Sequence, residues 1–359
     1  MTITLVGGLK SLRSKQFNYD FDLETGVLDT WGKTIDEDPD ICEAGPLIAD
    51  VEITTRCGGV NGKPCAYCYK DNREIGDNMS FGTFKKVIEQ IDYNGQLTQV
   101  ALGLGARGEE NPDIWKMCEW LRNRHIIPNG TVAQPTDRAC EKIGEYFGGV
   151  AVSYHGDFEV LLDSVEKLVN ASRRHATLKQ VNIHYVLCEE TYNDLIKLFA
   201  LALTDDRLEG LNAIVLLALK KCGRAKTGPF TRLSFQKFKT AIGTALQNGI
   251  GLGFDSCSAN SFIRAARELY PPERAEEFVK LAEPCEASLM SAYVGVDATY
   301  HPCSFCQGSA RYSWEGWKML GPVSFKKLWE GYSETMNSFR NNLLDKRRSC
   351  PVYDVDMGD

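Results

Sequence analysis

The alternation of apolar runs and helical patterns after residue 50 is the feature that most constrains the fold of this chain. The apolar runs cover residues 47–53, 99–105, 130–133, 149–154, 180–187 and 213–219. Helical patterns separate them, and the first can begin at Ser80, a residue type that caps helices. Near-continuous apolar runs are typical of parallel strands covered on both faces. Six such units predict an α/β fold built on a partial (β/α)6 barrel.

Two hairpins are predicted outside these units. Residues 18–22 and 27–31 alternate in polarity around Glu24-Thr25-Gly26, which predicts an N-terminal hairpin that flanks or plugs the barrel. A second alternation surrounds residues 294–297. We therefore expect three parts: an N-terminal hairpin extension over 1–48, the barrel over 49–250, and a C-terminal domain over 251–359.

Three cysteines, Cys57, Cys65 and Cys68, directly follow the first predicted barrel strand. Chemistry in βα barrels collects at the C-terminal ends of the strands. A cubane iron–sulfur cluster takes a thiolate on each iron, so three cysteines leave one iron open for another ligand. Zinc also takes thiolates, usually from paired Cys-x2-Cys elements. Because only one such pair lies here, the loop favours a cluster, with zinc as the alternative.

The composition and charge of the chain indicate its cellular compartment and exclude some partners. The chain has 359 residues, a net charge of −7, a pI near 5.5 and thirteen cysteines. No secretory signal precedes these cysteines, so we expect thiols or metal ligands in a soluble cytoplasmic protein. No apolar run approaches the length of a membrane span. The net negative charge does not indicate the basic surface that nucleic-acid binding favours. The length suits one large domain with an appended module.

With Tyr67 before its last cysteine, the loop resembles that of the radical SAM superfamily, whose three cysteines follow the first strand of a partial TIM-like barrel. The spacing here is Cys-x7-Cys-x2-Cys, against the common Cys-x3-Cys-x2-Cys. The resemblance implies a [4Fe–4S] cluster that binds S-adenosylmethionine through its amino and carboxylate groups, with Tyr67 packed against the adenine. It also implies reductive cleavage to a 5′-deoxyadenosyl radical and an external electron donor such as flavodoxin or ferredoxin.

The resemblance also assigns roles at other strand ends. Gly105, Gly108 and Glu109 stand where the family binds the methionine amino group, although no adjacent glycine pair precedes Glu109. Ser153 is the candidate for the methionine carboxylate or ribose, and Leu217 for packing under the adenine. Each has a plainer interpretation: a turn for the glycines, a local hydrogen bond for the serine, and a core position for the leucine. His184 is expected to be a satisfied interior residue.

A second set of cysteines lies in the C-terminal third: Cys257, Cys285, Cys303, Cys306 and Cys350. With the hairpin between them, this set resembles the SPASM and twitch extensions of radical SAM enzymes, which bind an auxiliary [4Fe–4S] cluster. The resemblance makes Cys257, Cys285, Cys303 and Cys350 the ligands and Cys306 the spare. Structural zinc on Cys303-x2-Cys306 and two others is the alternative. Ordinary buried thiols are expected at Cys42, Cys118, Cys140, Cys188 and Cys222.

The resemblance therefore predicts a radical SAM enzyme, most simply one that modifies a peptide or protein. No pattern before Asp50 resembles a leader-binding winged helix, so a small-molecule substrate such as a sugar or alcohol is the alternative. Asp255, beside Cys257, could accept a proton in an oxidation, or could simply cap a turn. A different class also stays open: a non-catalytic iron–sulfur or zinc protein.

Overall fold

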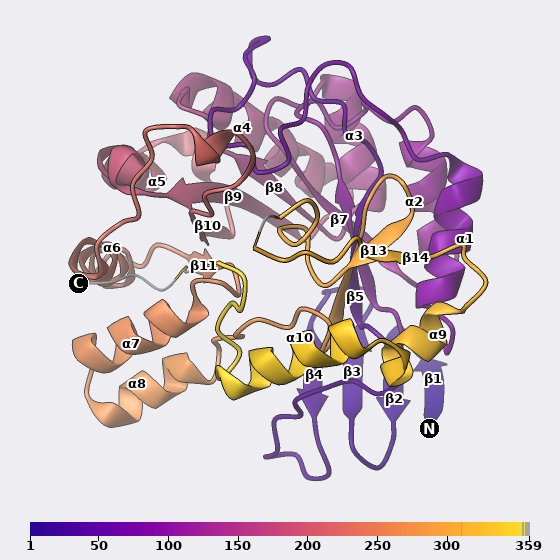
Figure 1. Cartoon of the computed structure of the whole chain (residues 1–359). Helices are drawn as coiled ribbons and strands as arrows, with labels where there is room; N and C mark the ends of the chain where they lie inside the picture. The colour runs from indigo at the N-terminus through magenta and orange to yellow at the C-terminus, as the bar shows by residue number, and fades with distance from the viewer. Residues whose placement is uncertain (310, 354, 356–359) are drawn as a thin grey trace.

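A ten-stranded sheet organises the fold of the computed structural model, which describes residues 1–309, 311–353 and 355. Seven strands run parallel in consecutive order: β5 (Ile48–Glu52), β6 (Gln99–Gly103), β7 (Ile127–Val132), β8 (Gly149–Ser153), β9 (Gln180–Leu187), β10 (Ala213–Ala218) and β11 (Leu252–Phe254). The predicted α/β class with a large parallel sheet is confirmed (Figure 1).

One helix connects each pair of consecutive parallel strands: α1 (Phe81–Ile91), α2 (Ile114–Arg122), α3 (Asp137–Tyr146), α4 (Phe158–Arg174), α5 (Tyr192–Thr204) and α6 (Phe235–Gln247). Because crossovers between parallel neighbours are right-handed, consecutive strand order places these helices on one face of the sheet. Ala49 and Val51 of β5 belong to the core under this face. Asp50 and Glu52 alternate with them and face the opposite side.

Most predicted elements agree with the structure within a few residues. As expected, Ser80 caps α1, since its side chain accepts a hydrogen bond from the Thr83 amide at 3.1 Å. Strand β7 begins three residues before its predicted start, at Ile127. Strand β11 was not predicted as a seventh parallel strand, and it pairs with β10 across the predicted boundary at residue 250. As a result, Asp255 and Cys257 follow a strand of the same sheet.

The N-terminal segment forms an antiparallel sheet of four strands rather than one hairpin: β1 (Thr2–Val6), β2 (Leu9–Arg13), β3 (Asn18–Asp22) and β4 (Leu28–Trp31). The predicted hairpin is β3 and β4. The Tyr19 hydroxyl donates to the Gln96 carbonyl at 3.0 Å, and Lys10 Nζ to the Leu97 carbonyl at 2.6 Å. Both carbonyls precede β6, so this sheet flanks the end of the large sheet opposite the cysteine loop.

The C-terminal third returns to the large sheet beside β5. Strand β12 (Ser291–Val294) pairs parallel with β5, and β13 (Thr299–His301) and β14 (Trp317–Lys318) extend the sheet antiparallel. The hairpin predicted around residues 294–297 is β12 and β13. The described residues of this part also form helices α7 (Ala259–Leu269), α8 (Pro272–Val279), α9 (Phe325–Lys327) and α10 (Glu334–Asp345), and the π-helix η4 (Leu328–Tyr332).

A second hydrophobic core joins the two ends of the chain. Leu12 and Tyr19 of the N-terminal sheet share it with Phe339 and Leu343 of α10. Figure 1 shows α10 passing across the N-terminal strands. Cys306 is buried in the same core. In the part of the chain that the structure describes, no helix is long and apolar enough to span a membrane.

Removal of the Asn111 side chain should destabilise the fold. Asn111 is buried, and its amide donates to the carbonyls of Ile53 at 2.7 Å and Met79 at 2.9 Å, which ties the end of β5 to the start of α1. Asn111→Ala leaves these carbonyls short of a donor, so we expect the free energy of unfolding to fall by about 2 kcal/mol. Urea denaturation followed by circular dichroism measures this.

The matched control is Asn123→Ala, because Asn123 is exposed just after α2. Its effect should stay within about 0.5 kcal/mol. Equal effects of the two variants would contradict the role assigned to Asn111.

Candidate functional site

A cavity of about 530 Å³ opens at the C-terminal ends of the parallel strands. Small residues on the helix-free face, such as Ala101 and Gly103 of β6, leave room for it. The cavity brings together eight of the predicted site residues: Cys57, Cys65, Cys68, Tyr67, Gly105, Ser153, Leu217 and Asp255. His184, expected in the interior, also lines it. Residues from seven strands, β5 to β10 and β12, and from the cysteine loop therefore converge on one space.

Two residues of the loop after β10 hold the cysteine loop in place. The Arg224 guanidinium donates to the Cys65 carbonyl at 2.9 Å and to the Asn72 carbonyl, and its amide donates to the Cys68 carbonyl at 2.9 Å. Gly223 has a φ of +52°, and a Cβ there would lie 2.3 Å from the Cys68 carbonyl oxygen. Only glycine allows this close approach.

The pKa of the Cys65 thiol depends on the two other thiols of the loop. Burial, together with the charges of Cys68 and Cys57, raises the pKa of Cys65 to about 12, although the charge of Arg224 acts to lower it. A thiol with a raised pKa is protonated at pH 7, so it needs a bound metal to stay a thiolate. Among the described residues, no three His, Cys, Asp or Glu side chains lie close enough together to hold a single metal ion. A cubane cluster gives each thiolate its own iron and so spreads them more widely. Three thiols on one loop beside the cavity are donors that suit such a cluster.

Tyr67 belongs to the cysteine loop, and its side chain contacts the residues that follow β8. Its hydroxyl donates to the Tyr154 carbonyl, and its ring stacks on His155 with centroids 5.6 Å apart. Burial lowers the pKa of His155 to about 4, so the imidazole is neutral at pH 7. His155 Nδ1 is buried without a hydrogen-bond partner among the described residues. Sequence reasoning missed His155, although its position two residues beyond Ser153 was a signal.

The glycine-rich loop after β6 contributes less to the cavity than the sequence suggested. Gly105 lines the cavity, whereas Gly108 and Glu109, both described, lie outside its lining. The Glu109 carboxylate accepts a hydrogen bond from the Thr136 hydroxyl and lies 3.6 Å from the Arg138 guanidinium. Thr136 caps α3. The carboxylate of Glu109 is therefore engaged at the start of α3.

Asp255 faces the cavity and also holds a turn. Its carboxylate accepts from the Ser258 amide at 3.0 Å and from the Ser258 hydroxyl at 2.6 Å, as the capping interpretation requires. It also forms an ion pair with Lys220. Burial acts to lower the pKa of Lys220, but the charges of Asp255 and Cys257 raise it above its ordinary value. The ammonium therefore stays charged beside both groups.

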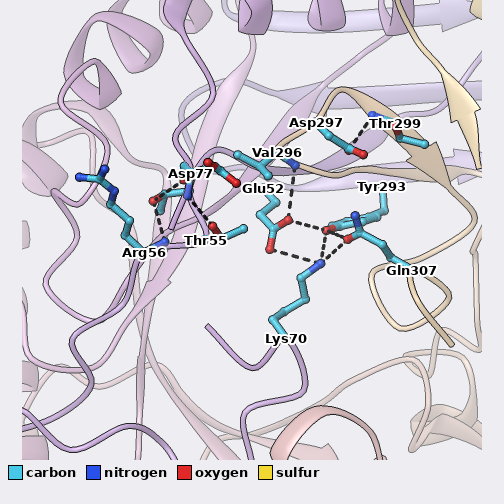
Figure 2. A network of polar contacts seen from close by, with 11 residues as sticks. Glu52, Thr55, Arg56, Lys70, Asp77, Tyr293, Val296, Asp297, Thr299 and Gln307 are labelled. Carbon is cyan, nitrogen blue, oxygen red and sulfur yellow. Dashed lines mark hydrogen bonds and ion pairs between the residues drawn. The ribbon is translucent and has the colours of Figure 1, made fainter. Parts of the chain in front are cut away.

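A second ion pair joins Lys70, just after the cysteine loop, to Glu52 of β5, and hydrogen bonds extend it to the C-terminal segment (Figure 2). Lys70 Nζ lies 3.2 Å from Glu52 Oε1 and donates to the Tyr293 hydroxyl at 2.6 Å and to Gln307 Oε1. The Tyr293 hydroxyl lies 3.2 Å from Glu52 Oε2 and 2.8 Å from Gln307 Oε1, and donates to one of them at a time. Sequence reasoning missed this network. The two acidic residues within the apolar strand β5 were its signal.

The five cysteines of the predicted C-terminal set pack in or against the second core. Cys303 Sγ lies 3.5 Å from Cys306 Sγ. Burial raises the pKa of Cys285 to about 12, and the charges of Cys303 and Cys350 add to this. Burial likewise raises the pKa of Cys257, with a contribution from Cys285 and Cys350. The structure thus brings these thiols into one neighbourhood.

Cys222 joins the same neighbourhood, which the sequence did not indicate. It packs against the second core, and its pKa is raised by burial and by the charges of Cys303 and Cys68. Its position in the loop after β10 places it between the two groups of cysteines. Cys222 is free, and it is half-buried rather than buried as expected. Cys42, Cys118, Cys140 and Cys188 are buried and free, as expected.

No family model matches this sequence, and no curated protein matches it. Solved structures of SuiB from Streptococcus suis do share its fold. The structure bound to precursor peptide SuiA gives a TM-score of 0.61 at 12% identity, over 83% of this chain and 67% of that chain. The structure bound to S-adenosylmethionine gives 0.57 at 13%, over 82% and 65%. A third SuiB structure gives 0.53 at 14%, over 86% and 67%.

This chain therefore spans about two thirds of the length of those SuiB chains. Because the identities are low, the likeness is one of fold. The shared fold agrees with the α/β fold that the sequence predicts.

Gly223→Ala should release the cysteine loop. An added Cβ meets the Cys68 carbonyl and strains a positive φ, which costs about 1–3 kcal/mol even without the clash. We expect faster hydrogen–deuterium exchange in peptides covering residues 65–71, measured by mass spectrometry. The matched control is Gly249→Ala, where φ is also positive but nothing lies within 4 Å of the added Cβ. Unchanged exchange over residues 65–71 in Gly223→Ala would disprove the clamp.

Proposed function

We propose that this chain is a radical SAM enzyme in which Cys57, Cys65 and Cys68 hold a [4Fe–4S] cluster with one iron open to S-adenosylmethionine. The observation that carries the proposal is the meeting of three thiols on one loop above a cavity at the strand ends. When bound, the cluster supplies an electron that cleaves S-adenosylmethionine to methionine and a 5′-deoxyadenosyl radical, which abstracts a substrate hydrogen atom.

The chain's own residues would position S-adenosylmethionine and exclude water. Tyr67 and Leu217 both line the cavity and offer packing surfaces for the adenine. Ser153 offers its hydroxyl to the methionine carboxylate or the ribose. Gly105 keeps the backbone open, because a Cβ there would lie 2.6 Å from the Arg56 carbonyl oxygen. In this proposal Gly108 and Glu109 shape the turn that presents Gly105 to the methionine amino group.

The C-terminal cysteines would hold an auxiliary [4Fe–4S] cluster. Cys257, Cys285, Cys303 and Cys350 are the proposed ligands, with Cys306 as the spare, and their shared neighbourhood supports this choice. Strands β5 to β10 with their helices would form the partial (β/α)6 TIM-like barrel over 49–250. The N-terminal extension over 1–48 and the auxiliary-cluster domain over 251–359 would flank it. An external donor such as flavodoxin or ferredoxin would supply the electron.

A peptide or protein is the proposed substrate. The support is the shared fold with SuiB, which has been solved bound to a precursor peptide. The cavity of about 530 Å³ lies within the range of ligand pockets and could take one amino-acid side chain beside S-adenosylmethionine. Asp255 faces this space and remains the candidate acceptor for a proton lost by the substrate.

Anaerobic reconstitution tests the proposal. Iron and sulfide are quantified per chain, and 5′-deoxyadenosine is then measured by chromatography after dithionite and S-adenosylmethionine are added. We expect about eight irons, as two cubanes require, together with 5′-deoxyadenosine. Zinc in place of iron, without 5′-deoxyadenosine, would overturn the enzyme assignment. A cluster that never cleaves S-adenosylmethionine would instead indicate electron transfer.

Cys65→Ala should distinguish the two proposed clusters, because it removes a ligand of only one of them. Loss of one loop thiolate should abolish cleavage of S-adenosylmethionine and remove about four of about eight irons, because the C-terminal cysteines keep their own cluster. The matched control is Cys140→Ala, which removes a buried thiol of α3 outside both groups. It should retain both the iron and the cleavage. Complete loss of iron in Cys65→Ala would refute the two-cluster arrangement.

A further inference from the structure

The charged side chains that line the cavity are paired, with one exception. Five of the lining residues carry formal charge: Asp50, Glu52, Lys70, Lys220 and Asp255. Glu52 pairs with Lys70 and Asp255 with Lys220. In the described part of the chain, the Asp50 carboxylate has neither a hydrogen bond nor an ion pair. Among these five residues, Asp50 is therefore the one whose charge is not compensated.

The histidines of the lining do not offset this charge. Burial lowers the pKa of His155 and of His184 to about 4, so both rings are neutral at pH 7. His184 Nδ1 lies 3.3 Å from the Thr131 hydroxyl, which is a neutral partner. A cation that enters the cavity would therefore meet a carboxylate that no described side chain has paired.

The position of Asp50 keeps its carboxylate open to such a molecule. Asp50 lies in the middle of β5, beside Tyr293 of β12 and Ala101 of β6. Ala101 is too small to cover it, and the side chain is exposed to the cavity. Because strands and loops enclose the cavity, protein still surrounds Asp50, and this burial raises the pKa of its carboxyl to about 6. Ionised Asp50 is thus poorly stabilised by the protein alone.

Aromatic side chains surround the same space. Tyr69, Tyr293 and Phe305 line the cavity, and the rings of Tyr69 and Phe305 lie 4.4 Å apart. Aromatic rings pack against alkyl chains and attract cations through their faces. Lys70 Nζ already lies over the Tyr293 ring, 4.9 Å from its centroid, and Lys220 Nζ over the Phe305 ring at 4.6 Å. The lining thus accepts ammonium groups on alkyl stems, and Asp50 is the lining carboxylate that lacks such a partner among the described residues.

We propose that Asp50 selects the substrate, by pairing with a cationic side chain of the modified peptide, lysine or arginine, that enters the cavity. This inference rests on the proposed function, because it specifies the substrate of the same site. The sulfonium of S-adenosylmethionine is a second cation that could reach the cavity. Asp50 lies two residues deeper along β5 than Glu52 and seven residues before Cys57. This depth favours the substrate over the cofactor that binds at the loop.

Binding of two matched probes tests the proposal. The probes are N-acetyl-lysine methylamide and N-acetyl-norleucine methylamide, which differ in the ammonium group. Their affinities are measured by titration calorimetry on the reconstituted full chain with S-adenosylmethionine present. We expect the lysine probe to bind the wild-type protein about tenfold more tightly, as one charge-assisted hydrogen bond would give. In Asp50→Asn this preference should vanish while norleucine binding stays unchanged.

The control variant is Asp29→Asn, which removes an exposed carboxylate of β4 and should keep the preference. Failure of the lysine probe to bind wild type more tightly, or a preserved preference in Asp50→Asn, would overturn the proposal. So would a loss of S-adenosylmethionine affinity in Asp50→Asn, because it would assign the carboxylate to the cofactor. Probe binding requires no turnover, so 5′-deoxyadenosine formation by wild type reports separately on the proposed function.

Discussion

The buried ammonium of Lys70 is the charge around which the two halves of the site are arranged. Its side chain is only 14% exposed, and its partner Glu52 is 5% exposed. A charge removed from water needs several partners to offset the lost hydration, and loss of one partner leaves another stranded. Those partners come from β5, from β12 through Tyr293, and from Gln307 beside Cys306. The cysteine loop is therefore fixed relative to the C-terminal cysteines by a contact that neither segment can form alone.

The same strand explains why a cavity exists beneath the loop. Ala49 and Val51 of β5 pack under the helices, whereas Asp50 and Glu52 point to the other face. On that face β6 offers only Ala101 and Gly103 near the rim. Acidic and small side chains cannot fill the space that branched residues fill in a packed barrel interior. The composition of two neighbouring strands thus leaves an open space next to the thiols.

Local patterns predicted the fold well where each element depends on its own residues. The apolar runs and the cap at Ser80 needed no distant partner. Strand β7 was predicted to begin late because Pro128 and Asn129 weaken the pattern, and β11 was missed because glycines interrupt its short run. The Lys70–Tyr293 contact spans 223 positions in the chain, and no local signal specifies it. Glu109 matched a family position, but the nearby Thr136 and Arg138 draw its carboxylate away from the cavity.

The loop after β10 connects the two groups of cysteines at a second place. Gly223 and Arg224 hold the loop of Cys65 and Cys68, while Lys220 lies against Asp255 and acts on the charge of Cys257. Cys222 stands between these contacts. Lys220, Cys222, Gly223 and Arg224, four residues within the stretch 220–224, therefore contact or influence one or both groups. The two sites are therefore mechanically joined through this loop, as well as through the Lys70 network, and the cavity lies between these two connections.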